Sequence, residues 1–288
     1  MRFVRVALSF GLSLTASSAI AQNAAPAPAA PAQEVLRVCV DPDNLPFSDK
    51  EGRGFENRIA AIIGSAWNRR VEFAWWPVRR GFFTRGLNGR YCDVAITAPS
   101  QLDMAAVTLP YFRSAYVMVY RKDSGLELTS LDDPALKRLR IGVNLLNADS
   151  ENTPPAMALS AHGIVGTLVG FGTFYSDSTR PEDIINAVIN RTIDVAIVWG
   201  PLAGYFAQRS PVPLVLNPIL QDTLSGIPFA FDISMAVRRR DRALRDSLQI
   251  VLDTHQSEIQ AVLREFGVPL LPLSPDTSRG AAGKPPGR

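Results

Sequence analysis

A buried strand, a polar loop and a helix follow one another at the start of the folded part of the chain. Residues 35–40 form an apolar, β-branched run, and residues 41–53 are rich in Asp, Asn, Pro, Gly and Ser. A helix is predicted to begin near Gly54 and to continue through residues 59–63. In open α/β sheets, ligands bind beyond the carboxyl ends of the strands, where loops and helix N-termini present unpaired donors. The polar loop is therefore the first candidate binding surface.

Alternation of strands with helices continues along the chain and predicts an α/β fold with two similar halves. The predicted strands are residues 35–40, 71–75, 92–97 and 116–121, then 140–143, 168–171, 194–199 and 212–216, and finally 231–237. The predicted helices are residues 54–63, 79–89, 155–161 and 181–189, and a long one at 241–266. The βαβαβ order favours a parallel sheet in each half. We therefore expect a cleft between the halves that captures a ligand by hinge closure.

The first 21 residues have the parts of an export signal. Arg2 and Arg5 give a positive start, and residues 6–14 are an apolar run too short to span a membrane. Ala-Ile-Ala at residues 19–21 has the small-x-small cleavage pattern. We expect residues 1–21 to be a cleaved signal peptide and the mature protein to lie in a bacterial periplasm. No other segment is long and apolar enough for a membrane span.

Low-complexity segments flank the folded region. Residues 22–33 are Ala- and Pro-rich and residues 274–288 are similar, so both are expected to be disordered. The formal net charge of +3 falls to +1 when Arg2 and Arg5 leave with the signal peptide. This small charge gives no reason to expect a nucleic-acid partner.

The two cysteines, Cys39 and Cys92, form an even pair, which favours a disulfide in an oxidising compartment. They are predicted on neighbouring strands, but Cys39 is late on its strand and Cys92 is early on its own. Such an offset can hold the Cα atoms too far apart for a bridge, so both states stay open here. The two histidines, His162 and His255, show no ligand spacing with either cysteine, and we expect neither a metal site nor a cofactor.

Several strings in the sequence carry a family resemblance: DPDNLPFS at 41–48, GFENRIA at 54–60, RRGFFTRGLN at 79–88 and DVAIVWGPLAGY at 194–205. Together with Pro110-Tyr111 they resemble the type II periplasmic solute-binding proteins of the amino-acid-receptor kind (extracellular solute-binding family three). Within that family they look like the quinoprotein-dehydrogenase-associated putative ABC-transporter substrate-binding branch (MoxJ/XoxJ type). That branch includes the J protein of methanol-oxidation operons. The similarity spans nearly all of residues 34–267.

The resemblance implies a two-lobed Venus-flytrap fold of the type II periplasmic binding proteins, with two crossover segments as the hinge. Lobe 1 would consist of residues 34–120 plus 217–273, and lobe 2 of residues 121–216.

One departure from the family bears on the ligand. Amino-acid receptors of this kind carry an arginine shortly before the Pro-Tyr motif, and it clamps the ligand's carboxylate. This chain has Gln101-Leu102-Asp103 there, and residues 147–151 (Asn-Ala-Asp-Ser-Glu) replace the usual anion loop of the second lobe. An Asp in place of the clamp should repel an ordinary amino acid.

The candidate ligand-cleft residues come from the predicted strand ends and loops: Asp41, Asn44, Phe47, Thr97, Gln101, Asn147, Asp149, Ser150 and Trp199. A hard cation is the alternative ligand, held by Asp41, Asn44, Asp103, Asn147, Asp149 and Glu151. However, the chain lacks the D-x-D-x-D-G loop typical of calcium, and scattered loop acids are commonly caps and turn residues. We therefore favour a small organic ligand.

A second candidate surface lies around Trp76, Arg79, Arg80 and Phe82. Trp and Arg are the usual anchors of protein–protein contacts, so an exposed patch here would dock a partner. The alternative is that these aromatic residues belong to the core of the first lobe.

The sequence has no G-x-S-x-G elbow and no recognisable Ser-His-Asp or Cys-His set, which argues against an enzyme. The resemblance implies a non-enzymatic binding protein associated with a PQQ-dependent methanol or alcohol dehydrogenase, as an accessory or maturation factor. The alternatives are a receptor that delivers a small solute to an ABC importer and a dehydratase-like enzyme that uses cleft acids such as Asp41 or Glu56.

Overall fold

The computed structural model describes residues 34–79, 81–146, 152–176 and 178–275, all within one contact unit that spans residues 33–288. The predicted signal peptide and the Ala/Pro-rich segment lie outside this part of the chain. Of the predicted tail only Ser274 and Pro275 are described, and the Ser274 N–H donates to the Asp232 carboxylate. No helix among the described residues has the length and apolar character needed to cross a membrane.

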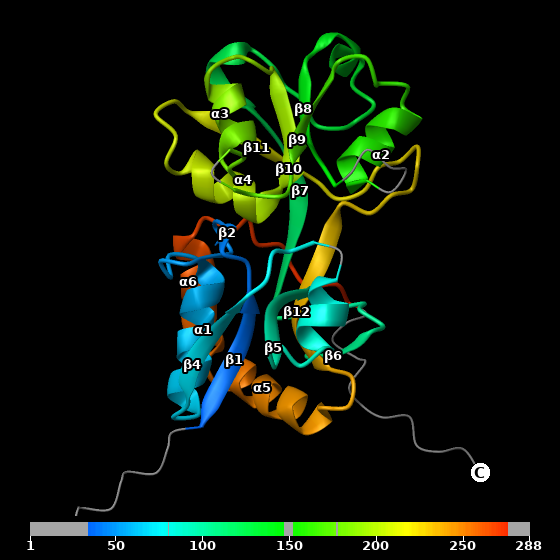
Figure 1. Ribbon diagram of the computed structural model, residues 1–288. Helices are drawn as coiled ribbons and strands as arrows, with labels where there is room; N and C mark the ends of the chain where they lie inside the picture. The colour runs from blue at the N-terminus through cyan, green and yellow to red at the C-terminus, as the bar shows by residue number, and fades with distance from the viewer. Residues whose placement is uncertain (1–33, 80, 147–151, 177, 276–288) are drawn as a thin grey trace, which may run out of the picture. The chain divides into compact units, whose positions relative to one another are not determined.

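The first lobe is a mixed sheet covered by helices (Figure 1). Its strand order is β4 (Arg70–Trp75), β1 (Val35–Val40), β5 (Val94–Pro99) and β12 (Ala230–Arg238), with β6 (Ala105–Val107) beside β12. β1 runs parallel to β4 and β5, and β12 runs antiparallel to β5. The other elements of this lobe are the hairpin β2 (Asp43–Asn44) and β3 (Ser48–Asp49), the helices α1 (Phe55–Ala66), α5 (Arg242–Thr254) and α6 (Gln256–Glu265), and the π-helix η1 (Phe82–Leu87). Phe55, Ile59 and Ile63 recur at helical spacing on α1, and they are fully buried in the core.

The second lobe repeats this plan. Its strand order is β11 (Leu214–Ile219), β7 (Phe112–Arg121), β10 (Val195–Trp199), β8 (Ile141–Leu145) and β9 (Leu168–Gly172), with β8 parallel to β9 and β10. Its helices are α2 (Pro154–Ala161), α3 (Asp183–Ile189) and α4 (Gly200–Ala207), with 3-10 turns η2 (Lys122–Ser124) and η3 (Pro134–Arg138). Along β10, Val195 and Ile197 enter one apolar cluster while Ala196 and Val198 enter another, so both faces of the sheet are buried.

Two strands belong to both lobes. Residues 112–115 of β7 pair antiparallel with residues 230–233 of β12, whereas from Tyr116 onward β7 pairs with β10 and β11. Strand pairing therefore changes lobe inside β7 and at the start of β12. The sequence-based division placed the two boundaries after residue 120 and after residue 216. In the structure the change on β7 comes earlier in the chain, and the change at β12 comes later.

The predicted strands and most predicted helices are present, with two differences. The long helix expected at residues 241–266 is two helices, α5 and α6, which break at His255. The hydroxyl of the preceding Thr254 bonds back to the Ile250 carbonyl, a contact that tends to bend helices. The helix α4 was not among the predicted helices; its Pro201 lies in the first turn, where its missing N–H costs nothing.

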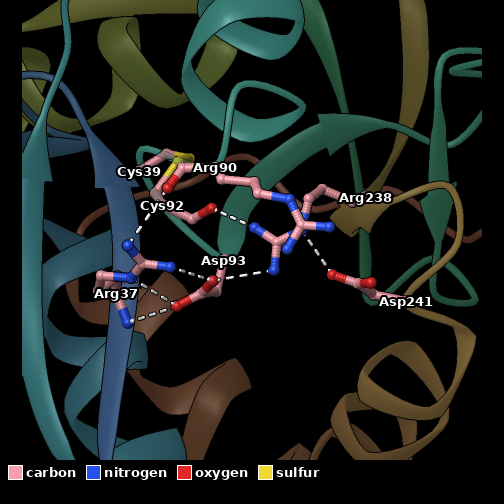
Figure 2. A network of polar contacts seen from close by, with 7 residues as sticks. All are labelled: Arg37, Cys39, Arg90, Cys92, Asp93, Arg238 and Asp241. Atoms are coloured by element: carbon pink, nitrogen blue, oxygen red, sulfur yellow. Dashed lines mark hydrogen bonds and ion pairs between the residues drawn. A yellow bond between two sulfur atoms is a disulfide. The ribbon is translucent and has the colours of Figure 1, made fainter.

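An ion-pair network centred on Asp93 ties β1 and β12 to the turn that precedes β5 (Figure 2). Arg37 of β1 donates from Nε and Nη2 to the two carboxylate oxygens of Asp93, at 3.0 and 2.9 Å. Arg238 of β12 donates to Asp93 at 2.9 Å, to the Cys92 carbonyl at 2.6 Å and to Asp241 at 2.6 Å. Burial alone would raise the pKa of Asp93, but the two arginines outweigh it and hold that pKa below its ordinary value.

The second lobe contains the same arrangement at the equivalent place. Arg140 pairs with both carboxylate oxygens of Asp194 and donates to the Arg191 carbonyl, as Arg37 pairs with Asp93 and donates to the Arg90 carbonyl. Arg90 and Arg191 share a left-handed backbone conformation, with φ of 64° and 59°. The expected equivalence of the strands that begin near Asp93 and Asp194 is thus visible in their contacts.

Cys39 and Cys92 form a disulfide with a Cα–Cα distance of 5.3 Å. The sequence left the bridge undecided because the two cysteines were expected at opposite ends of neighbouring strands. That offset does not occur, because Cys92 does not lie on the neighbouring strand. It belongs to the turn that precedes β5, where the Asp93 N–H donates to the Arg37 carbonyl and brings the turn beside β1. Both cysteines are buried in a small cluster with Phe82 and Leu87 of η1.

Asp93→Asn is expected to lower the free energy of unfolding by about 2 kcal/mol, because two guanidinium groups lose their shared anion in a partly buried site. Asp194→Asn is the matched control. Its ion pair is more exposed, with Arg140 and Asp194 side chains 50% and 30% exposed, so a smaller loss is expected. Urea unfolding at pH 7 measures both. The difference between wild type and Asp93→Asn should shrink as the pH falls through the lowered pKa of Asp93. An equal or larger loss for Asp194→Asn would contradict this ranking.

Removal of the disulfide by Cys39→Ala with Cys92→Ala is expected to cost about 3 kcal/mol, because the bridge closes a long loop in the unfolded chain. Wild-type protein treated with dithiothreitol should unfold in urea at the same midpoint as the double variant. Oxidised and reduced wild type with equal midpoints would contradict the prediction.

Candidate functional site

A cavity of about 550 Å³ is lined by both lobes and by the two strands they share. The first lobe contributes Asn44, Phe47, Glu56, Val78, Phe82, Phe83 and residues 95–99. The second contributes Asn144, Leu146, Thr153, Pro154, Thr173, Tyr175, Trp199 and Leu202, and the shared strands contribute Tyr116, Phe231 and Ile233. We call this cavity the cleft. Its size suits a small organic ligand, and most of its wall is apolar or aromatic.

The loop after β1 is held tightly against the start of α1. The N–H groups of Phe55 and Glu56 donate to the carbonyls of Pro46 and Phe47, at 2.9 and 2.8 Å. A Cβ at Gly54 would lie only 2.1 Å from the Phe47 carbonyl oxygen, so only glycine fits at this position. This close approach places the Phe47 ring and the Glu56 side chain in the same cleft.

Asp41 directly follows β1 and organises the loop beneath the cleft. Its carboxylate oxygens accept from the backbone N–H of Asp43 at 3.0 Å and of Val78 at 2.6 Å. Burial raises the pKa of Asp41, and these two N–H groups partly offset that rise. The side chain is buried and is not among the residues that line the cleft. Its contacts are those of a turn-forming residue.

Glu56 lies at the floor of the cleft and is 8% exposed. Burial raises the pKa of its carboxyl from 4.5 to about 7, while the hydroxyls of Thr97 and Ser48 lower it in part and the charge of Asp41 raises it further. No basic side chain contributes to this shift. The Thr97 hydroxyl faces the carboxyl and favours its ionised form, although its oxygen does not reach ideal hydrogen-bond geometry with any described residue.

Aromatic side chains gather where the shared strands pass between the lobes. The ring of Tyr116 lies 5.3 Å from Trp199 and 6.4 Å from Phe231, and Trp199 lies 6.0 Å from Phe231, all edge to face. Burial raises the pKa of Tyr116 and of Tyr175, so both phenols stay neutral over the working pH range.

The predicted ligand residues divide into three groups. Asn44, Phe47, Thr97 and Trp199 line the cleft. Asp41 lies beneath it, and Gln101 is exposed and not among its lining residues, because β5 ends at Pro99 and the chain has left the cleft by that point. The remaining candidates, Asn147, Asp149 and Ser150, fall outside the described residues, as does Glu151 of the alternative cation set.

None of the described residues that line the cleft is Lys or Arg. Arg113, on the shared strand β7, instead faces Asp232 of β12, with its Nη1 3.4 Å from each carboxylate oxygen. The described part of the chain also contains no group of three or more His, Cys, Asp or Glu side chains placed to hold a metal ion.

The structure separates the members of the predicted docking patch. Arg79 is exposed, and Trp76 is half-buried against Tyr91 at a ring distance of 5.3 Å. Phe82 is only 6% exposed, so its expected exposure was wrong: it packs on the disulfide cluster and lines the cleft. The physical reason is that η1 turns its first residue inward. Arg80 lies outside the described residues.

Sequence reasoning did not place Tyr116, Tyr175 or Phe231 in the cleft, and it named Glu56 only as a cleft acid of the dehydratase-like alternative, not as a ligand residue. Tyr116 and Phe231 lie on β7 and β12, the two strands shared by the lobes. The strand pattern in the sequence does not reveal that these strands cross between lobes. Glu56 had one local signal, its position directly after Gly54-Phe55, where the glycine forces close contact with the binding loop.

Glu56→Gln is expected to be more stable than wild type at pH 8 by about 3 kcal/mol, and equal to it at pH 4. The folded state raises the pKa of Glu56 to about 7, so wild type loses stability as the pH rises from 4.5 to about 7 and the buried carboxyl ionises. Glutamine resembles the protonated form and removes this dependence. Urea unfolding of both proteins from pH 4 to pH 8 measures the difference, and a difference that does not change with pH would contradict the burial of an uncompensated carboxylate.

No protein-family model matches the chain. Protein MoxJ of Methylorubrum extorquens is 30% identical over 255 residues, which cover 85% of this chain and 85% of that protein. The solved structure of periplasmic binding protein XoxJ from Methylobacterium extorquens AM1 is 38% identical, covers 83% of this chain and 100% of that chain, and has a TM-score of 0.68. MxaJ from Methlophaga aminisulfidivorans MPT is 27% identical, covers 82% of this chain and 100% of that chain, and has a TM-score of 0.69.

More distant solved structures share the fold alone. An ancestral cationic amino acid solute-binding protein is 18% identical, covers 81% of this chain and 95% of that chain, and has a TM-score of 0.61. The two lobes, the shared strands and the cleft described above are the features of a type II periplasmic binding protein. With the identities to MoxJ and XoxJ over most of their lengths, they show that the chain belongs to the MoxJ/XoxJ family of periplasmic binding proteins.

Proposed function

We propose that this protein is a non-catalytic periplasmic binding protein that acts beside a PQQ-dependent methanol or alcohol dehydrogenase as an accessory or maturation factor. It would reach the periplasm through a signal peptide cleaved after Ala21. Family membership supports the setting, since the branch that the sequence resembles is named for its association with quinoprotein dehydrogenases. The cleft would close around a segment of the dehydrogenase or a small ligand and so favour the competent state of the partner.

The observation that carries this proposal is the chemistry of the cleft wall. An amino-acid receptor needs a guanidinium to clamp the carboxylate of its ligand, and the described cleft residues offer none. They offer instead a largely apolar cavity with Phe47 on one lobe and Trp199 on the other. Such a wall fits apolar groups of a partner better than a free zwitterion, whose carboxylate would lie near Glu56 without compensation.

Pull-down from periplasmic extract with the tagged mature chain is expected to recover the dehydrogenase. Phe47→Ala with Trp199→Ala removes one aromatic wall from each lobe and should weaken binding by at least about tenfold, as for central interface aromatics. Leu224→Ala, a change at a side chain that is 61% exposed and does not line the cleft, is the matched control and should bind as wild type does. Affinities are measured with purified dehydrogenase by surface plasmon resonance.

Two outcomes would replace the proposal. Recovery of no dehydrogenase, together with an amino acid that raises the melting temperature, would indicate a receptor that serves an ABC importer. Turnover of a substrate that Asp41→Asn abolishes would indicate a dehydratase-like enzyme.

A further inference from the structure

The floor of the cleft carries a buried carboxyl group, and none of the described residues that line the cleft is basic. Glu56 is more than nine-tenths buried and lines the cavity, and the nearby Thr97 hydroxyl oxygen is buried with no hydrogen-bond partner among the described residues. The Tyr111 hydroxyl is occupied elsewhere, since it donates to the Ile96 carbonyl at 3.1 Å. The groups that favour the ionised form of Glu56 are two neutral hydroxyls, those of Thr97 and Ser48, so a charged donor from a ligand would stabilise the carboxylate further.

The charged groups that act on Glu56 and Tyr175 at this floor are acidic. Asp41, at the end of β1, acts electrostatically on Glu56 and also on Tyr175, which enters the cleft from the second lobe. Tyr111 and Tyr116 face the same region and stay neutral, because burial raises the pKa of each phenol. Arg79 acts on Asp41, but no Lys, Arg or His is among the described lining residues. Among the described lining residues no basic side chain offsets the Glu56 carboxylate, which favours a negative potential at the floor when Glu56 is ionised.

The walls above the floor are aromatic on several sides. The rings that line the cleft are Phe47, Phe82, Phe83, Tyr116, Tyr175, Trp199 and Phe231. The face of an aromatic ring attracts a cation, and the attraction is larger where water is excluded. The same rings accommodate an apolar body attached to the cation. A carboxylate has neither interaction here.

We propose that the cleft binds an organic cation, an ammonium group carried on an apolar body, with Glu56 and Thr97 accepting from the ammonium and the aromatic walls enclosing the rest. This inference names the ligand class of the site in the proposed function and rests on the cleft being the binding site. The ammonium group can belong to a free amine or to a lysine or N-terminal amine of a bound protein segment. Both sources present the same chemistry to Glu56.

Binding of a cation requires the ionised carboxylate, so it is coupled to release of the Glu56 proton. Because the pKa of Glu56 is about 7, the ionised fraction rises roughly tenfold between pH 6 and pH 8. The affinity for an ammonium ligand should rise by the same factor. A ligand with a neutral hydroxyl in place of the ammonium should not gain affinity over this range.

Isothermal titration calorimetry with three matched probes tests the inference: phenethylammonium, phenethyl alcohol and 3-phenylpropionate. Phenethylammonium is expected to bind most tightly, and roughly tenfold more tightly at pH 8 than at pH 6. Glu56→Gln should lose at least tenfold in affinity for it and lose the pH dependence. Glu258→Gln, a change at an exposed carboxyl on α6, should behave as wild type does. Circular dichroism of Glu56→Gln checks that this variant is folded.

A short apolar peptide with a free N-terminal amine, and its N-acetylated form, distinguish the two sources. The free-amine peptide could bind while phenethylammonium does not, and acetylation of the peptide could abolish its binding. This result would uphold the cation site and assign the ammonium group to a protein segment. Equal or tighter binding of 3-phenylpropionate, or ammonium binding unchanged in Glu56→Gln, would overturn the inference. If no ammonium probe binds while the dehydrogenase is still captured, this inference fails and the proposed function stands. If the ammonium probe binds and no dehydrogenase is captured, the cation site stands and the proposed role beside a dehydrogenase fails.

Discussion

An uncompensated carboxyl group at the floor of an apolar cleft is the constraint from which the chemistry of this protein follows. Glu56 is buried because Gly54 brings the start of α1 against the loop after β1, and the described cleft residues include no base to neutralise it. Desolvation then raises the pKa of the carboxyl to about 7. A cleft of this kind disfavours carboxylate ligands and favours groups that donate hydrogen bonds or carry positive charge. Its selectivity is thus opposite to that of a receptor with an arginine clamp.

The cleft lies between two lobes, and each lobe has its own ion-pair network. Each lobe has the same ion pair between the start of one strand and the start of its neighbour, Arg37 with Asp93 and Arg140 with Asp194. The first lobe adds Arg238 and the disulfide, which join β12 and β1 to the turn before β5. The lobes share β7 and β12, and the aromatic residues at that junction line the cavity. A change in the angle between the lobes would therefore reshape the aromatic wall directly.

Much of this fold could be predicted from the sequence because its strands are short apolar runs in a regular strand–helix order. The equivalence of the segments that begin near Asp93 and Asp194 was visible as a repeated Asp-Val-Ala-Ile, and the loop at residues 41–48, the first candidate binding surface, contributes Asn44 and Phe47 to the cleft. The site was less predictable. Tyr116 and Phe231 reach the cleft through pairing between strands far apart in the sequence, which local patterns do not encode. Phe82 looked like a surface anchor because its burial depends on the turn that places Cys92 beside β1.

Direct titration of Glu56 tests the central claim most closely. Carbon-13 NMR of side-chain carboxyl groups in protein labelled at glutamate, recorded from pH 3 to pH 9, would report each glutamate pKa. We expect one resonance to titrate near pH 7 and to be missing from the spectrum of Glu56→Gln, while the exposed glutamates titrate near their ordinary values. If every glutamate titrates at its ordinary value, Glu56 is solvated or neutralised by a base, and the cleft does not have the character described above.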